Sequence, residues 1–212
     1  MEAVAAIRLG LVDDHPAIEA AIEAAARAAV PAITLSHAAR TADEGIALAT
    51  LTAAERPHVV LSDLQLGGGL EGIRVIEALA AAGIRAIAFT SFDRASLMRA
   101  VFEAGGVGFV SKASEMDDVI AAVRTVAAGG TAFTVEAIGA ARSAPRAPSE
   151  RERAVLRGIV SGATSDEVGV RLGISGRTVE SHVRRLFDRY GVVSRTELAV
   201  LADREGWIVG EP

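Results

Sequence analysis

The sequence contains no cysteine and only one lysine, one tryptophan and one tyrosine among its 212 residues. Without cysteine the chain has no disulfide bond, no thiolate nucleophile and no cysteine-based zinc site. No stretch of about 18 uncharged apolar residues occurs, so no segment is expected to span a membrane. The first residues, MEAVAAIRLGLVDDHP, carry an acid early and run directly into strand-like sequence, so no signal peptide is expected. These absences favour a cytoplasmic protein.

The composition favours two folded domains of different charge. Half of the residues are apolar, which excludes a wholly disordered chain, and the length suits two modest domains. Residues 1–130 hold 16 acids and 10 bases, whereas residues 149–212 hold ten of each. The net charge of −5 therefore belongs to the front of the chain.

Short apolar runs alternate with helical patterns through the front half. The patterns predict strands at 7–12, 33–36, 58–62, 84–89 and 107–110, and helices at 16–29, 42–54, 70–82, 94–104 and 115–128. Five strand–helix units predict an α/β doubly wound fold, in which a parallel five-stranded sheet carries helices on both faces. Ligands of such folds bind outside the carboxyl ends of the strands.

The back half is expected to be a small all-α domain. Residues 1–128 form the predicted first domain, 129–148 a linker with little periodicity, and 149–212 the second domain. Capping signals predict helices at 149–161, 164–172, 175–190 and 195–205. The two short helices joined by Leu-Gly-Ile-Ser, of which the second is rich in arginine, are typical of a helix-turn-helix.

Polar side chains stand at the ends of four predicted strands. Asp13 and Asp14 follow the first strand, Asp63 follows the third, Thr90 the fourth and Lys112 the fifth. Taken singly, each has an ordinary interpretation as a cap, a turn former, strand filler or a solvated charge. The single lysine marks either a site that needs a compact ammonium group or simple drift. Together these residues predict one pocket in which clustered carboxylates bind Mg²⁺ and one carboxylate attacks phosphorus.

The segments LVDDHP, VVLSDLQL, FTS and GFVSK resemble the receiver domain of bacterial two-component response regulators. DDHP in particular resembles the NarL/FixJ group, which joins a receiver to a LuxR-type helix-turn-helix. The match covers residues 7–125 and, with the second domain, nearly the whole chain. The resemblance implies that Asp63 accepts a phosphoryl group from a sensor histidine kinase. It also implies that Asp13, Asp14, Asp63 and the backbone carbonyl of Gln65 hold Mg²⁺.

The same resemblance implies a switch beside the acceptor. Lys112 would pair with a phosphoryl oxygen, Thr90 would bind the phosphoryl group and move inward, and Phe109 would follow it as the switch aromatic. A new charge of about −2 would bias this bistable element and so control dimerisation or release of the DNA-binding domain. One departure is Leu-Gly-Gly-Gly at 66–69, where the family usually has Met-Pro; glycine there predicts a looser loop.

Residues 149–209 resemble the LuxR-type helix-turn-helix, which implies binding to promoter DNA. Glu180 stands where many relatives carry lysine, and its carboxylate can accept from cytosine but repels phosphate. For His182, packing and a phosphate contact remain equally open. The residues expected at the DNA are Arg177, Thr178, Glu180, Ser181, His182, Arg184, Arg185 and Arg189.

The expected function is that of a DNA-binding response regulator that dimerises when phosphorylated and catalyses only its own phosphorylation and dephosphorylation. Two alternatives are a DNA-binding regulator that is constitutive, with a front domain that only dimerises, and an aspartyl-phosphate enzyme of the haloacid-dehalogenase type. The enzyme needs a second acid two residues after its nucleophile, where this chain has Gln65.

Overall fold

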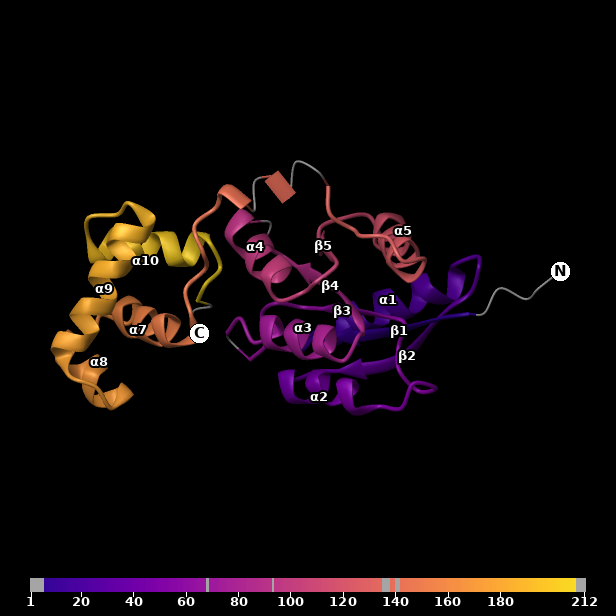
Figure 1. The fold of residues 1–212 in the computed structure, drawn as a ribbon, viewed down its shortest axis with the longest axis horizontal. Coiled ribbons are helices and arrows are strands. Elements are labelled where there is room, and N and C mark those ends of the chain that lie inside the picture. The colour runs from indigo at the N-terminus through magenta and orange to yellow at the C-terminus, as the bar shows by residue number, and fades with distance from the viewer. Residues whose placement is uncertain (1–5, 68, 93, 135–137, 140–141, 209–212) are drawn as a thin grey trace. The chain divides into compact units, whose positions relative to one another are not determined.

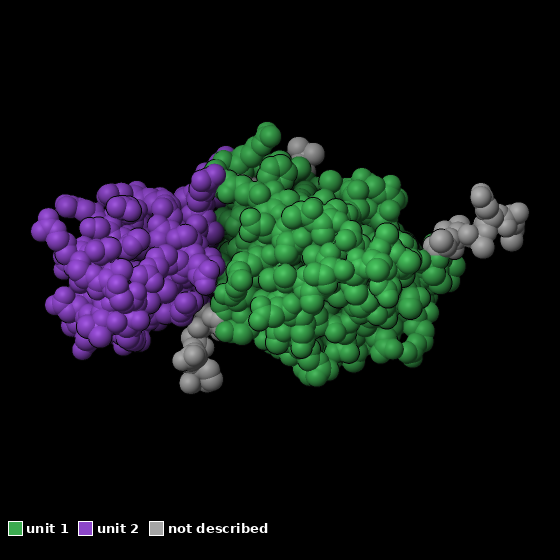
Figure 2. Space-filling view, turned by 60° about the horizontal axis from the view of Figure 1, so that its bottom comes forward, with its two compact units in different colours: residues 1–142 green, residues 143–212 purple. Residues whose placement is uncertain are grey.

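The computed structural model describes residues 6–67, 69–92, 94–134, 138–139 and 142–208. The chain divides into two compact units, Met1–Arg142 and Ser143–Pro212 (Figure 2). Their boundary falls inside the predicted linker. Residues 135–137 and 140–141 of that linker, and residue 68 of the glycine-rich loop, lie outside the described residues.

The first unit contains one parallel five-stranded sheet with the order β2-β1-β3-β4-β5 (Figure 1). The strands are β1 (Ile7–Val12), β2 (Ile33–Ala39), β3 (Val59–Ser62), β4 (Arg85–Thr90) and β5 (Gly108–Ser111). All four residues of β3 are buried, as expected for a central strand covered on both faces. Val12 pairs with Ser62, so β1 and β3 end at the same level.

Helices cover both faces of this sheet (Figure 1). They are α1 (Pro16–Ala28), α2 (Ala42–Ala47), α3 (Gly72–Ala81), α4 (Ala95–Glu103) and α5 (Met116–Ala127). Helices α1 and α5 contact each other and close one core, in which Leu9, Leu61 and Phe89 of the sheet are buried. The doubly wound fold expected from the alternating pattern is confirmed.

The helix predicted at 42–54 is shorter than expected. Helix α2 ends at Ala47 and continues only as a 3₁₀ turn, η1 (Leu48–Thr50). The guanidinium of Arg56 donates to the carbonyls of Ala49, Leu51 and Ala82. Because this side chain satisfies the carbonyls at the end of η1, the chain can leave the helix there.

The second unit consists of four described helices, α7 (Glu150–Val160), α8 (Ser165–Leu172), α9 (Gly176–Tyr190) and α10 (Arg195–Arg204). The predicted capping boxes are both present, from Ser149 to Glu152 and from Thr164 to Glu167. Trp207 is 1% exposed and its ring lies 4.4 Å from that of Tyr190, so it belongs to the core of this unit. Among the residues described, no helix combines the length and apolar character needed to cross a membrane.

Candidate functional site

The sheet brings the predicted acidic residues to one edge. Asp13 directly follows β1, and Asp63 directly follows β3 and donates its backbone N–H to the carbonyl of Val12. Lys112 directly follows β5 and donates its backbone N–H to the carbonyl of Thr90. The strand hydrogen bonding therefore continues into the residues that carry the charges, which fixes where their side chains begin.

Lys112 lies between two buried carboxylates. Its Nζ is 2.7 Å from Oδ2 of Asp13 and 2.7 Å from Oδ2 of Asp63. The side chains of Asp13 and Asp63 are 0% and 4% exposed, and that of Lys112 is 10% exposed. The three predicted residues thus form one desolvated cluster rather than three separate surface charges.

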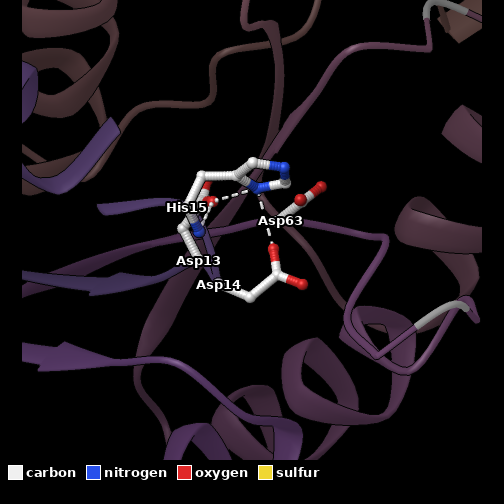
Figure 3. A group of neighbouring side chains, drawn as sticks. All are labelled: Asp13, Asp14, His15 and Asp63. Carbon is white, nitrogen blue, oxygen red and sulfur yellow. Dashed lines mark hydrogen bonds and ion pairs between the residues drawn. The ribbon is translucent and has the colours of Figure 1, made fainter. Parts of the chain in front are cut away.

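His15 is a member of this cluster that the sequence analysis missed. Its Nδ1 lies 3.0 Å from Oδ1 of Asp13 and 2.8 Å from Oδ1 of Asp14 (Figure 3). Its backbone N–H also donates to Asp13. The imidazole is exposed, with 64% of the side chain accessible. The only sequence signal was its position directly after the acid pair.

Burial shapes the ionisation of the cluster. Burial raises the pKa of Asp63, against the opposing effects of Lys112 and of the Gln65 N–H, which donates to Oδ1. Burial alone would lower the pKa of Lys112, but hydrogen bonds to Asp13 and Asp63 outweigh it and raise that pKa. Lys112 is therefore a fixed cation, and additional positive charge nearby would stabilise the ionised form of Asp63.

The donor set fits a small divalent cation. Asp13, Asp14, His15 and Asp63 each offer one ligand atom, and these atoms lie within 4.8 Å of one another. Carboxylate oxygens dominate the set, and hard oxygen ligands suit Mg²⁺. Gln65 is next to this group, since its backbone binds Asp63.

The two predicted switch residues occupy different environments. Thr90 is fully buried at the end of β4, and its Oγ1 accepts a hydrogen bond from the backbone of Phe92. Phe109 is half-buried in β5. Thr90 lies on β4 and Phe109 on β5, and these paired strands end next to the acidic cluster.

Gly72 is a second residue of the site that the sequence analysis missed. It begins α3 and donates to the carbonyl of Leu64. A Cβ at this position would lie 1.8 Å from the carbonyl oxygen of Asp63. The loop between β3 and α3 is also closed, because Leu66 and Gly69 exchange two backbone hydrogen bonds. These contacts hold the loop that carries Asp63 against the start of α3.

A second candidate site is the exposed face of α9. Its buried residues Val179, Val183 and Leu186 pack into the unit. The exposed residues between them include most of the predicted DNA contacts, namely Arg177, Thr178, Glu180, Ser181, Arg184 and Arg185. The helix is held at its start by Ser175, whose Oγ accepts from the N–H of Thr178. A rigid helix with polar and basic side chains on one face is suited to a DNA groove.

The remaining two predicted DNA contacts are tied into the unit. Arg189 makes a bidentate ion pair with Glu152 of α7, at 2.8 and 3.0 Å. His182 is half-buried, and its Nδ1 is buried without a hydrogen-bond partner among the described residues. The structure thus gives Arg189 a role inside the domain and turns one edge of His182 inward.

Comparison with known proteins identifies both units. Residues 9–124 match the response regulator receiver domain, and residues 149–202 match the bacterial regulatory proteins of the luxR family. The chain belongs to the NarL/FixJ family of response regulators.

Similar response regulators cover nearly the full length of the chain. The probable transcriptional regulatory protein NarL of Mycobacterium tuberculosis strain H37Rv is 28% identical, and the alignment covers 94% of both chains. The crystal structure of the response regulator ChrA, of a heme-sensing two-component system, is 26% identical with a TM-score of 0.52 and covers 97% of this chain and 100% of that one. A structure of a response regulator RcsB–DNA complex has 20% identity and a TM-score of 0.58, covers 94% of this chain and 98% of that one, and shows the shared fold.

Family membership separates the DNA-binding regulators considered above from the enzyme. The protein is a DNA-binding transcriptional response regulator, and its family consists of regulators rather than metabolic enzymes. The haloacid-dehalogenase alternative is therefore wrong. Receiver domains typically bind Mg²⁺ at an acidic cluster, and Asp13, Asp14 and Asp63 form such a cluster here.

Proposed function

We propose that phosphorylation of Asp63 by a sensor histidine kinase switches this regulator between two DNA-binding states. The observation that carries the proposal is the placement of Lys112 between Asp13 and Asp63, with Asp14 beside them. A carboxylate oxygen of Asp63 attacks phosphorus, and the bond from phosphorus to the histidine nitrogen of the kinase breaks. The electron pair of that bond stays on the imidazole.

Each residue of the cluster has a definite task in this transfer. Lys112, already within reach of Asp63, pairs with a phosphoryl oxygen. Thr90, at the end of β4, forms a hydrogen bond with the phosphoryl group and moves inward. The side chain of Phe109 follows this movement of Thr90. Asp13, Asp14, Asp63 and the carbonyl of Gln65 would hold Mg²⁺, which would compensate the charge of the phosphoryl oxygens.

The acceptor is tested by mass spectrometry of the intact protein treated with acetyl phosphate and Mg²⁺. We expect the wild type to gain one phosphoryl group and Asp63→Asn to gain none. Asp43→Asn, which removes an exposed acid of α2, is the matched control and should be labelled like the wild type. Labelling of Asp63→Asn to the wild-type level would show that another residue is the acceptor.

The DNA-binding surface is the exposed face of α9. Arg177, Arg185 and Thr178 would contact the backbone, and Glu180, Ser181 and Arg184 would reach base edges. Residues 149–212 are electrically neutral, with ten acids and ten bases, so long-range attraction to DNA is weak. Two copies on paired half-sites would supply the missing affinity, which makes a homodimer the active form.

We expect Arg184→Ala to weaken binding to a selected promoter fragment about tenfold, because one base contact typically contributes about 1–3 kcal/mol. Arg157→Ala on α7 removes the same charge from an exposed position of the same unit and should change affinity little. Equal losses in the two variants would mean that net charge, rather than the α9 face, determines binding.

The affinity for the promoter fragment, measured with and without the phosphoryl mimic beryllofluoride, distinguishes a phosphorylation switch from a constitutive regulator. A phosphorylation switch predicts tighter binding with the mimic. Equal binding would exclude the switch while leaving the DNA-binding function intact.

A further inference from the structure

The chain that follows α5 returns to the free edge of the sheet. Residues 131–134, here called the strap, run beside β5 as a short parallel addition in which Ala132 is paired with Gly108. The Ala132 N–H donates to the carbonyl of Val107 at 2.8 Å, and the Phe109 N–H donates to the carbonyl of Ala132 at 3.1 Å. β5 would otherwise present unpaired backbone groups at the sheet edge.

The strap also contacts α4. The ring of Phe133 meets that of Phe102 edge-on, with 6.1 Å between the ring centroids. This contact lies at the surface, where Phe102, Phe133, Met98 and Ile138 line an open pocket of about 150 Å³ and Phe102 is 48% exposed. Because the ring contact is already partly exposed to solvent, the strap can leave α4 at a smaller cost than a fully buried segment could.

The strap is joined directly to the switch region. The backbone of Phe109, the predicted switch aromatic, donates one of the two hydrogen bonds that hold the strap. Three residues further along the chain, directly after β5, Lys112 contacts Asp63 and donates its backbone N–H to the carbonyl of Thr90. A displacement of β5 therefore changes the strap's hydrogen bonds, and a displacement of α4 changes its ring contact.

The strap lies close to β5 because residue 108 of that strand is glycine and has no side chain. A Cβ added at Gly108 would lie 2.7 Å from the Cβ of Ala132, and Gly108 does not have a positive φ. Alanine at position 108 thus fits the backbone of β5 but displaces the strap. This gives a means of opening the strap without touching the acidic cluster.

We propose that the strap is the element that carries the state of the receiver into the linker: docked on β5 and α4 in the resting protein, and released when Asp63 is phosphorylated. The inference rests on the proposed phosphorylation of Asp63. Release frees the edge of β5 and the face of α4, and it lengthens the connection to the DNA-binding unit. Neither phosphorylation of Asp63 nor the DNA contacts of α9 require release of the strap. The inference about the strap can therefore be wrong while the proposed function is right.

The test uses full-length wild type, Gly108→Ala, Phe133→Ala and the double variant Gly108→Ala/Ala132→Gly, in which the displaced methyl group is removed from the strap. Each protein is measured with Mg²⁺ alone and with Mg²⁺ plus beryllofluoride. The readouts are amide hydrogen exchange at Ala132 and Phe109, and the sedimentation-derived dimerisation constant. Phosphoryl gain from acetyl phosphate is measured by mass.

In the wild type we expect beryllofluoride to speed exchange at these two amides about tenfold or more. Gly108→Ala and Phe133→Ala should exchange fast without the mimic, gain a phosphoryl group normally, and lose most of the difference in dimerisation between the two conditions. The double variant should recover the wild-type response, which separates strap displacement from general damage to β5.

Three results would overturn the inference. They are unchanged exchange at Ala132 when the wild type binds beryllofluoride, a full dimerisation response in Gly108→Ala and Phe133→Ala, and a double variant that behaves like Gly108→Ala. If instead the wild type gains no phosphoryl group, the proposed function fails on its own readout, whatever the strap does.

Discussion

At the scale of single residues, the acidic cluster combines one fixed cation with buried carboxylates. Lys112 contacts Asp13 and Asp63 at the same distance, 2.7 Å. Burial raises the pKa of Asp63, so the folded state favours its protonated form relative to the unfolded chain. The stability that this carboxyl contributes is present below its unfolded pKa, near 4, and is lost as pH rises through the higher folded pKa.

Asp63→Asn should therefore stabilise the Mg²⁺-free protein at pH 7, by an amount on the order of 1 kcal/mol. Urea unfolding followed by circular dichroism measures this gain, which should shrink at pH 4, where Asp63 takes up its proton. Mg²⁺ should stabilise the wild type more than the variant, because the variant lacks one anionic ligand. A variant that is less stable than wild type without Mg²⁺ would show that the pair with Lys112 outweighs the cost of burial.

The single tyrosine gives a second test at the same scale. Burial raises the pKa of Tyr190 to about 12, and its hydroxyl donates to the carbonyl of Arg146 at 2.6 Å. The stability contributed by the neutral phenol is present below about 10 and is lost as pH rises toward the folded value. Absorbance at 295 nm should titrate near the raised pKa in the native protein and near 10 in denaturant. Native titration near 10 would contradict the burial of this side chain.

At the scale of elements, the start of α3 and the loop after β3 depend on each other. Gly72→Ala would place a Cβ 1.8 Å from the Asp63 carbonyl, so one of the two segments must move. We expect a loss of about 2 kcal/mol or more in stability, and slower labelling by acetyl phosphate in the molecules that remain folded. Gly69→Ala is the matched control, because its Cβ would meet nothing closer than 3.8 Å. Equal effects of the two substitutions would contradict this account.

The elements themselves were largely predictable from sequence. All five strands were found, because a parallel sheet buries both faces and leaves continuous apolar runs, as in β3. The predicted strand ends therefore located Asp13, Asp63 and Lys112.

The edge strand β2 extends to Ala39, three residues beyond its predicted end, and most of it is only partly buried. The length of α2 was not predictable, because it depends on how the side chain of Arg56 folds. That side chain turns back onto the carbonyls of Ala49 and Leu51 and also donates to Ala82, 26 residues away.

Contacts between elements account for what the sequence analysis missed. Gly72 matters through a neighbouring backbone, and nothing in its local pattern indicates this. Arg189 lies at helical spacing with the predicted DNA contacts, yet it pairs with Glu152, 37 residues away. That ion pair helps to lower the pKa of Glu152 despite its burial, so it holds α7 against α9 above mildly acidic pH.

At the scale of the whole molecule, the two units carry separate spectroscopic signals. The only tryptophan and the only tyrosine lie in the second unit, and their rings are in contact. Indole fluorescence therefore reports unfolding of the DNA-binding unit, whereas circular dichroism reports helices of both. The acidic cluster belongs entirely to the first unit.

Mg²⁺ should accordingly raise the thermal midpoint of the component seen only by circular dichroism and leave the fluorescence transition in place. Asp14→Asn, which removes one ligand, should reduce the Mg²⁺ effect. A fluorescence transition that shifts equally with Mg²⁺ would show that the two units unfold as one cooperative body.

The scarcity of lysine has a practical consequence for experiments on this regulator. A reagent that acylates amines finds one side chain in the entire sequence, Lys112, and it is shielded by Asp13 and Asp63. Acylation would neutralise the only positive side chain that the described part of the chain places in contact with Asp63, so the extent of reaction at Lys112 can be compared directly with the loss of signalling competence. Acylation of Lys112 would thus both show that the reagent can reach the phosphorylation site and inactivate that site.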